Sequence, residues 1–379
     1  MKKHLWAVCY GLALTAFTSY AALDTFVIRR AYGEQTTSMN LEMFADTEAV
    51  PITSADTVTL PEADSSEAEQ ASEEGSSSEG AEENSASSSG SGEKHSKRSR
   101  SGQGGGSGRH SKSGDTAGFG GSGDGDNGTA AEVVGEVEGG TKTVTDENGN
   151  YSITLTEYDE YNTKIYVADV KLSSAQYLKT ALADDTYGKN ITEYTSSMAG
   201  SHGAVLAVNG DYYGVREQGY VIRNGIVYRD TPSGNDMMCV FTDGSMKIIN
   251  SDDYTADELV SMGVWQALDF GPALIEDGIV TVGTNDEVDR AKADNPRTAI
   301  GVIDSNHFIF VVSDGRTDES EGLTLYQLAQ FMQRLGVTTA YNLDGGGSST
   351  MYFDGAVVNN PTSGGSIKER AVSDIVYIG

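Results

Sequence analysis

The fold class is decided by the stretch Val221-Ile222-Arg223-Asn224-Gly225-Ile226-Val227-Tyr228. Two apolar runs flank an Asn-Gly pair, and this pair readily adopts the positive φ angles of a tight two-residue turn. Asn-Gly between β-forming residues is the strongest short-range signal for a hairpin. The sequence therefore predicts two antiparallel strands at this point.

The same pattern recurs on both sides of this hairpin. Further pairs of apolar runs flank short turns rich in Asp, Gly, Ser or Asn, which are typical turn residues. The predicted strand pairs are 238–241 with 246–249, 274–275 with 279–280, 299–303 with 308–312, and 350–353 with 357–358. Single strands are expected over 153–155, 164–170 and 205–208, and short helices over 177–182 and 191–198.

One longer helix interrupts the hairpins, between Leu325 and Leu335. Its apolar residues recur at helical spacing, Thr324 is a suitable N-cap, and Gly336 follows as a stop signal. Many hairpins with a few helices predict an α+β fold built on a mixed, mainly antiparallel sheet. We expect a single globular domain over residues 144–379.

The composition changes before this domain. Residues 31–143 are rich in Ser, Gly and Glu, and they offer too little apolar surface to offset the entropy of ordering, so they are predicted to be a disordered linker. Residues 1–30 are predicted to be a cytoplasmic stub and a signal anchor, because the run from Leu5 to Leu23 carries no charge and is long enough to cross a bilayer as a helix. A secretory signal cleaved after Ala21 is the competing interpretation.

These features together predict the location of the domain. It is expected outside the cytoplasm, attached to the cell membrane by a single N-terminal helix, or secreted if the signal is cleaved. Only Cys9 and Cys239 are present, so the domain has no internal disulfide and must rely on its own core.

The formal net charge of -30 bears on the partners. It disfavours nucleic acid, because binding to phosphate backbones requires a basic surface. Strong acidity can recruit a divalent cation such as Ca²⁺, although a solvated acidic surface is the plainer explanation. His202, His307 and Cys239 show no zinc-ligand spacing, so the sequence assigns no metal ligands.

Four polar clusters stand at the ends of predicted strands, where binding groups are often placed. They are residues 208–214, 295–298, 313–316 and 342–350. The last reads Asn342-Leu343-Asp344-Gly345-Gly346-Gly347-Ser348-Ser349-Thr350. Its glycines allow positive φ angles that present successive N–H groups to an anion, and its hydroxyl groups add donors.

The loop matches neither of two common catalytic motifs. No Gly-Lys-Ser/Thr follows, as a P-loop requires, and no glycine stands two residues after a serine, as a nucleophile elbow requires. Asp344 can orient a hydroxyl group, act as an acid or base, or bind a cation. A glycine-rich turn packed against a helix is the structural alternative.

The other clusters supply charged groups. Arg297 and Arg316 are candidates to bind phosphate, since a guanidinium binds it in a bidentate manner; the alternative is pairing with Asp294 or Asp318. Asp314 and Asp344, with Glu321 nearby, are the carboxylates that hydrolysis of a glycosidic bond would need. Turn aspartates also commonly cap backbone N–H groups.

The combination of motifs resembles the phosphodiester glycosidase family, from about Tyr151 to Gly379. The matching segments, in order, are Asn209-Gly210-Asp211-Tyr212-Tyr213, Phe270-Gly271-Pro272, Asn295 to Gly301, Asp314-Gly315-Arg316, Gly322-Leu323-Thr324-Leu325 and Asn342 to Thr350. The resemblance implies release of a sugar from a sugar-1-phosphodiester.

The resemblance also implies roles for individual residues. The arginines, with the glycine loop from Gly345 to Ser349, would bind the phosphodiester anion, and Asp344 with Asp314 would act as acid, base or nucleophile. Asn209 would bind a sugar hydroxyl, and Asp211 belongs to the same binding set.

For a tethered bacterial enzyme, the expected substrate is a sugar-phosphate polymer of the cell wall or an exopolysaccharide. The sequence identifies no required cofactor. A non-catalytic polysaccharide-binding module and a metal-dependent phosphodiesterase remain the alternative functions.

Overall fold

The computed structural model describes residues 5–33, 38–39, 140–286 and 294–379. Most of the predicted linker, residues 34–37 and 40–139, lies outside the described residues, as do residues 287–293 of the domain. The apolar N-terminal run forms helix α1 (Leu5–Phe26). Across the described ranges, no helix combines the length and the apolar character needed to cross a membrane. Strand β1 (Arg30–Ala31) pairs with β6 (Gly188–Lys189).

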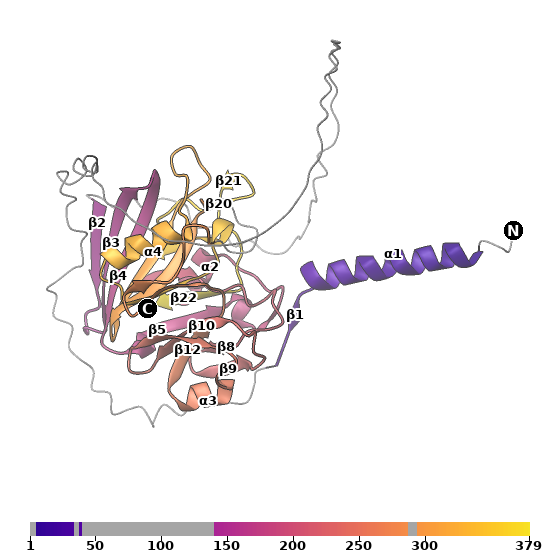
Figure 1. Ribbon diagram of the computed structural model, residues 1–379, viewed down its shortest axis with the longest axis horizontal. Coiled ribbons are helices and arrows are strands. Elements are labelled where there is room, and N and C mark those ends of the chain that lie inside the picture. Colours follow the sequence, from indigo (N-terminus) through magenta and orange to yellow (C-terminus); the bar gives the residue numbers. More distant parts are fainter. Residues whose placement is uncertain (1–4, 34–37, 40–139, 287–293) are drawn as a thin grey trace, which may run out of the picture. The chain divides into compact units, whose positions relative to one another are not determined.

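The largest sheet has eight strands in the order β14-β13-β17-β15-β16-β4-β3-β2. Figure 1 labels three of them, β2, β3 and β4. Its strands are β2 (Thr141–Thr145), β3 (Tyr151–Glu160), β4 (Thr163–Leu172), β13 (Ala273–Glu276), β14 (Ile279–Val280), β15 (Arg297–Asp304), β16 (His307–Ser313) and β17 (Thr339–Asn342). Each neighbouring pair among them is antiparallel.

Two five-stranded sheets complete the framework, in the orders β11-β10-β12-β8-β9 and β19-β18-β7-β22-β5. Their strands are β5 (Leu178–Leu182), β7 (Leu206–Asn209), β8 (Val221–Arg223), β9 (Ile226–Arg229), β10 (Asp236–Phe241), β11 (Met246–Asn250), β12 (Val264–Leu268), β18 (Met351–Phe353), β19 (Ala356–Val357) and β22 (Asp374–Ile378). A small hairpin joins β20 (Thr362–Ser363) to β21 (Ser366–Ile367). The predicted hairpin over 221–228 is confirmed as β8 and β9.

The core lies between these sheets, and the middle of strand β15, from Ala299 to Ile303, illustrates why a strand in this position is apolar on both faces. Ile300 and Val302 pack into the main core with Val208 and Val240 from the other two sheets. Ala299 points to the opposite face and packs in the cluster that contains helix α4. Because successive side chains of a strand point to opposite faces, a strand covered on both sides must be apolar at both sets of positions.

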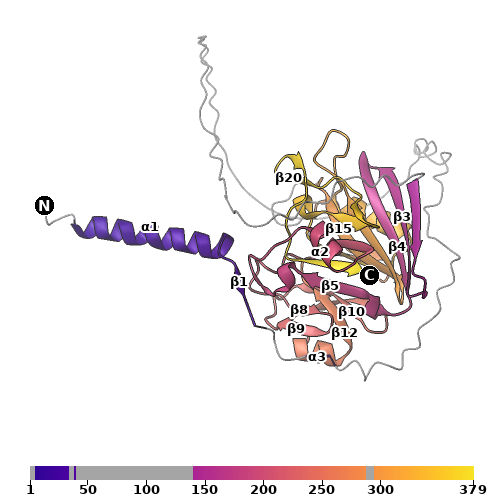
Figure 2. The ribbon, with the colours of Figure 1, turned by 180° about the vertical axis from the view of Figure 1, so that it is seen from behind.

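Three helices, α2, α3 and α4, cover the outer faces of the sheets (Figures 1 and 2). Helix α4 (Leu325–Arg334) packs on the large sheet, α3 (Ala256–Ser261) on the sheet of β8 to β12, and α2 (Thr195–Ser201) on the sheet of β5 and β22. The predicted start of α4 is confirmed, because the Thr324 hydroxyl accepts a hydrogen bond from the Gln327 N–H at 3.0 Å in a capping box. Gly336 follows with a φ of 84°.

The predicted fold class, α+β with mainly antiparallel sheet, is confirmed, while two local predictions are wrong. Residues 177–182 are not helical: a single 3₁₀ turn (Ala175–Tyr177) leads directly into β5, which pairs with β22. The helix predicted over 191–198 begins only at Thr195. In both cases pairing with distant strands outweighs a weak local helical pattern.

Candidate active site

The predicted polar clusters meet where several strands begin or end. Strand β7 ends at Asn209, β16 at Ser313 and β17 at Asn342, while β15 begins at Arg297. The glycine-rich loop after β17 joins them: the Leu343 N–H donates to the Thr298 carbonyl at 2.9 Å, and the Asp344 N–H donates to the Gly210 carbonyl at 3.3 Å. Residues distant in sequence are thereby brought together around Asp344.

Asn209 holds both ends of this loop. Its side chain is fully buried, and its Nδ2 donates to the Asp344 carbonyl at 2.6 Å. Its Oδ1 accepts from the Thr298 hydroxyl at 2.8 Å and from the Thr350 N–H at 3.3 Å. The amide group is therefore engaged inside the protein. The structure gives Asn209 a role in positioning Asp344, in place of the contact with a sugar hydroxyl that the resemblance implied.

Asp211 is likewise internal. Its carboxylate pairs with the buried Arg223 at 2.9 Å, and it accepts from the Asp269 N–H at 2.9 Å and the Tyr213 N–H at 3.1 Å. Arg223 also pairs with Asp374 at 2.8 Å, so one guanidinium is shared by two buried carboxylates. Burial raises the pKa of Asp374 to about 7. This ion network anchors the chain that leads to residues 212–216.

The glycine loop supports two arginines. Gly346 has a φ of 62°, and a Cβ there would lie 2.7 Å from Nη2 of Arg316. A Cβ on Gly347 would lie 2.5 Å from Nη2 of Arg370. Only glycine allows guanidinium groups to approach the backbone so closely.

The loop's own donors are largely used internally. The N–H groups of Gly346, Ser348 and Ser349 donate to the Pro296, Gly345 and Gly346 carbonyls, and Ser348 and Ser349 are fully buried. The N–H groups of Gly346, Ser348 and Ser349 are therefore already engaged and do not contribute to the anion cradle that the sequence predicted for this loop. The loop instead serves as a platform under Arg316 and Arg370.

Arg316 and Arg370 form an unneutralised pair of positive charges. Arg316 donates to Oδ1 of Asn295 through Nε at 3.1 Å and Nη2 at 2.8 Å, and Arg370 donates to the Ser348 hydroxyl at 3.3 Å. Among the described residues, neither guanidinium forms an ion pair, and Asp318 does not pair with Arg316. Burial, and then the charge of Arg370, lower the pKa of Arg316. Exposed like charges side by side favour binding of an anion between them.

Asp344 lies beside this pair. Its Oδ2 accepts from the Ser348 hydroxyl at 2.6 Å, and the same hydroxyl accepts from Arg370. One oxygen atom therefore links the carboxyl group of Asp344 to the guanidinium group of Arg370. The residue keeps some exposed surface while neighbouring atoms desolvate its carboxyl group. Desolvation raises the pKa of Asp344, against the lowering effects of Ser348, Arg370 and Arg216. A carboxyl group with a raised pKa suits proton transfer near neutral pH.

Sequence reasoning missed two residues of this site, Arg370 and Tyr212. Tyr212 has a φ of 66°, which is uncommon for an aromatic residue and marks backbone strain of the kind found at functional sites. Burial, and then the charge of Asp344, raise the pKa of its phenol group, and Arg370 lowers it. The Asn-Gly-Asp-Tyr-Tyr motif contained Tyr212, but no local signal pointed to Arg370.

The remaining predicted residues lie around this centre without forming its exposed part. Asp314 is buried and accepts from the Asn360 N–H at 2.7 Å and from Asn359 Nδ2 at 3.2 Å. Asn359 also donates to the Ser349 carbonyl at 3.0 Å. Asp314 is therefore connected to the glycine loop through Asn359 and stabilises its position. Burial raises the pKa of Asp314.

Arg297 and Glu321 differ in their exposure. Arg297 is 2% exposed, and its Nε donates to the Leu323 carbonyl at 2.9 Å. The Gly345 backbone approaches its stem. Glu321 is exposed, and its backbone N–H and carbonyl hold the turn by contacts with Asn162 and Arg316.

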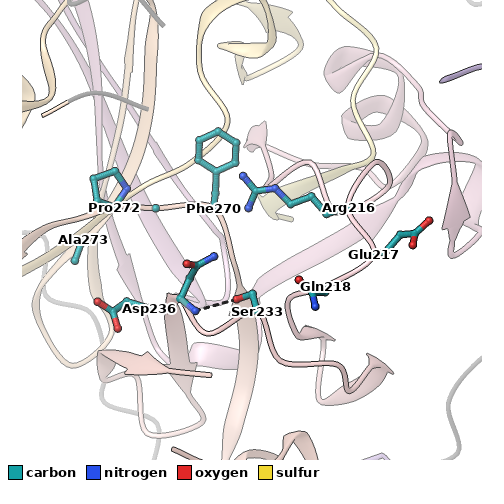
Figure 3. A pocket seen from close by; sticks show the side chains of 10 residues that line it. Arg216, Glu217, Gln218, Ser233, Asp236, Phe270, Pro272 and Ala273 are labelled. Carbon is teal, nitrogen blue, oxygen red and sulfur yellow. Dashed lines mark hydrogen bonds between the residues drawn. The ribbon is translucent and has the colours of Figure 1, made fainter. Parts of the chain in front are cut away.

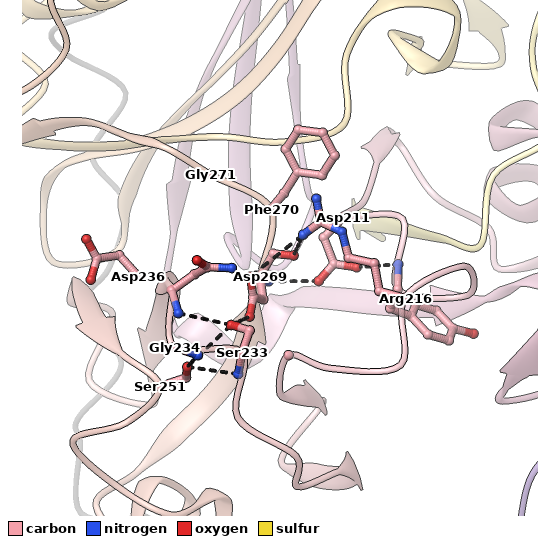
Figure 4. A network of polar contacts seen from close by, with 12 residues as sticks. Asp211, Arg216, Ser233, Gly234, Asp236, Ser251, Asp269, Phe270 and Gly271 are labelled. Carbon is pink, nitrogen blue, oxygen red and sulfur yellow. Dashed lines mark hydrogen bonds and ion pairs between the residues drawn. The ribbon is translucent and has the colours of Figure 1, made fainter. Parts of the chain in front are cut away.

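A cavity of about 800 Å³ lies beside the segment from Phe270 to Ala273 (Figure 3). Phe270, Gly271 and Pro272 line it, and Asn342 connects this wall to the loop by donating from Nδ2 to the Gly271 carbonyl at 2.8 Å. Arg216 lies 4.9 Å above the Phe270 ring and donates to the Asp269 carbonyl at 2.9 Å. Figure 4 shows how Asp211, Asp269 and Ser233 hold this wall in place.

Metal ligands are also relevant to the predicted alternatives. Within residues 5–33, 38–39, 140–286 and 294–379, no group of three or more His, Cys, Asp or Glu side chains is arranged to hold a metal ion. The carboxylates of the site instead form contacts within the protein. Asp211 pairs with Arg223, Asp344 accepts from Ser348, and Asp314 accepts from asparagine donors.

Comparisons with known proteins support the resemblance. The chain is 31% identical over 200 residues to the SPbeta prophage-derived uncharacterized protein YomE of Bacillus subtilis (strain 168), covering 51% of this chain and 30% of YomE. It is 39% identical over 66 residues to the N-acetylglucosamine-1-phosphodiester alpha-N-acetylglucosaminidase of Mus musculus, covering 17% of this chain and 13% of the mouse protein. The chain thus spans less than a third of the length of these curated relatives.

A solved structure and a family model extend the comparison. The zebrafish N-acetylglucosamine-1-phosphodiester alpha-N-acetylglucosaminidase catalytic domain, auto-inhibited by its pro-peptide, aligns over 63% of this chain and 81% of that chain, with 21% identity and a TM-score of 0.47. The family model described as phosphodiester glycosidase matches residues 202–379, which contain all the residues of the candidate site. The resemblance carried by the motifs is therefore confirmed, and residues 202–379 match the phosphodiester glycosidase family.

Proposed function

We propose that this protein hydrolyses the glycosidic bond of a sugar-1-phosphodiester. The observation that carries the proposal is that two guanidinium groups without ion pairs among the described residues, Arg316 and Arg370, lie against the glycine loop that begins at Asp344. The Ser348 hydroxyl contacts both Arg370 and Asp344, at 3.3 and 2.6 Å. A phosphate held by the arginines therefore places the adjoining C1–O bond close to Asp344.

The chemistry follows from these positions. When the C1–O bond breaks, its electron pair moves to the phosphate oxygen, and the two arginines stabilise the added negative charge. The sugar develops oxocarbenium character at C1. Asp344 takes a proton from the water whose oxygen bonds to C1, and its raised pKa makes it a stronger base than an ordinary aspartate. The products are the free sugar and a phosphate monoester.

The natural substrate is proposed to be a sugar-phosphate polymer of the cell wall or an exopolysaccharide. An extracytoplasmic domain would meet such a polymer, and the apolar N-terminal sequence and the Ser/Gly-rich stretch after it support that location. Fractionation of cells, with protease added to intact cells, tests it. Protection of the domain from protease until the cells are lysed would contradict the location.

Hydrolysis in ¹⁸O-labelled water tests the reaction directly. The full chain is incubated with UDP-N-acetylglucosamine and a panel of sugar-1-phosphodiesters, and the products are analysed by mass spectrometry. Cleavage between C1 and oxygen places the label in the released sugar, whereas a phosphodiesterase places it in the phosphate. Absence of sugar release from every substrate would refute the proposal.

Two controls separate the alternatives. Asp344→Asn is expected to abolish turnover while substrate still binds, and Asp318→Asn, on an exposed aspartate without an ion pair, should behave as the unmodified protein. Binding without turnover in the unmodified protein would instead favour a polysaccharide-binding module. Turnover that disappears on chelation and returns with Ca²⁺ would favour a metal-dependent enzyme.

A further inference from the structure

The cavity beside Phe270 is larger than hydrolysis at a single sugar requires. Its volume is about 800 Å³. Cavities of roughly 300 to 1,000 Å³ enclose ligands of drug size, which have the bulk of two to three linked sugar rings. A single sugar ring would fill only a fraction of this space.

The charged groups on the cavity wall already have partners. Glu217 accepts from Lys189 at 2.8 Å, Asp236 accepts from Asn250 at 2.9 Å, and Arg216 donates to the Asp269 carbonyl and stacks on Phe270. One positive and two negative lining side chains leave no excess of positive charge. The cavity is therefore a poor anion site, in contrast to the arginine pair at the glycine loop.

The groups that remain open are suited to neutral sugars. Asn235 and Gln218 line the cavity and are exposed, and in the described part of the chain no hydrogen bond occupies either side-chain amide. An amide group both donates and accepts, which matches the hydroxyl groups of a sugar. Phe270 adds an aromatic surface that packs against the apolar C–H groups of a ring. Figure 3 shows Phe270, Arg216 and Gln218 around one space.

The position of Asp344 sets the direction of the ligand. The carboxyl group is linked through Ser348 to Arg370 of the anion site. The wall at Gly271 is bonded to Asn342, two residues before Asp344. A phosphate on Arg316 and Arg370 lies on the leaving-group side of the C1–O bond. Arg216, on the cavity wall, lies near enough to Asp344 for its charge to lower the pKa of that carboxyl group, so a sugar bound at Asp344 has the wall formed by Arg216 and Phe270 beside it.

We propose that the Phe270 cavity binds a second neutral sugar linked to the one that carries the phosphodiester, so that the preferred substrate is an oligosaccharide-1-phosphodiester. This proposal rests on the proposed function, because the direction of the ligand is set by cleavage at Asp344. It assigns Phe270 to packing on the second ring and Asn235 to its hydroxyl groups.

Turnover of two matched substrates tests the proposal. The methyl phosphodiesters of N-acetylglucosamine and of N,N′-diacetylchitobiose are compared with the full chain. The expected kcat/KM for the disaccharide is higher by about tenfold, the effect of one or two added hydrogen bonds. Phe270→Ala and Asn235→Ala should lower this ratio toward one. The matched surface variants Tyr254→Ala and Asn148→Ala should leave it unchanged.

A binding measurement separates failure of this proposal from failure of the proposed function. Calorimetric titration of Asp344→Asn with free N,N′-diacetylchitobiose and maltose, each against its monosaccharide, requires no turnover. Tighter binding of a disaccharide that Phe270→Ala removes supports the cavity as a sugar site even if neither diester is cleaved. Equal binding of each disaccharide and its monosaccharide, or equal kcat/KM values for the two diesters, would overturn the proposal.

Discussion

Removal of the Ser348 hydroxyl should move the pH dependence of the enzyme in a defined direction. This hydroxyl donates to Asp344 at 2.6 Å and so stabilises the ionised carboxylate against the burial that raises its pKa. In Ser348→Ala the pKa of Asp344 should rise further. As a general base, Asp344 must be ionised, so the acidic limb of the kcat/KM profile should shift to higher pH.

The size of the shift follows from the energy of the lost contact. A hydrogen bond to a charged group contributes about 1.5 to 3 kcal/mol, and one pKa unit corresponds to about 1.4 kcal/mol. The limb should therefore move by about 1 to 2 pH units. Activity below the limb falls by about tenfold or more, while the plateau at high pH changes little.

The assay is release of sugar from a sugar-1-phosphodiester between pH 4 and 9, at constant ionic strength. Ser348→Thr keeps a hydroxyl group and should restore the limb toward its original position. Ser348 also contacts Arg370, whose charge lowers the pKa of Asp344, so displacement of Arg370 would move the limb in the same direction. An acidic limb that stays in place in Ser348→Ala would refute the assignment of Asp344 as the base.

Arg316→Gln and Arg370→Gln should each raise KM by about tenfold or more, because each removes a charged donor to phosphate, as steady-state kinetics will show. Gly347→Ala should also raise KM while the melting temperature changes little, because its Cβ displaces the mobile end of Arg370 and not backbone. Arg223→Met should cost about 3 to 5 kcal/mol in the free energy of unfolding, measured in urea, because it leaves two buried carboxylates unpaired. The raised pKa of Asp374 stabilises the fold below the unfolded-state pKa near 4, and this contribution is lost as pH rises to about 7. The melting temperature should therefore fall across that range, less so in Asp374→Asn, and a rise with pH would contradict the reasoning.

Much of the local architecture follows from short segments. The hairpin at Asn224-Gly225 is specified by its turn, since both residues have positive φ angles, of 52° and 74°. Helix α4 is specified by its apolar stripe and by the capping box at Thr324. These signals involve residues a few positions apart, so they are present in the sequence alone.

The roles of the site residues depend on contacts between distant segments. Asn209 and Asp344 are 135 positions apart, and their hydrogen bond turns a predicted sugar ligand into a support for the loop. Residues 178–182 form a strand because β22, near the C-terminus, is available for pairing. No sequence pattern near Asn209, or near residues 178–182, identifies the distant segment that each of them contacts.

The sequence by itself determined the hairpin-rich domain and the motifs that match the phosphodiester glycosidase family model, and it singled out the loop at Asp344 as a candidate site. Only the tertiary structure decided that this loop supports a pair of arginines. Gly346 and Gly347 are predicted as donors to an anion when taken alone, but in the fold the guanidinium groups of Arg316 and Arg370 lie against these two glycines, 2.7 and 2.5 Å from where a Cβ would stand. The backbone conformation of the glycine loop is largely encoded by its own residues. The guanidinium groups that lie against it belong to distant segments, which only the fold places there.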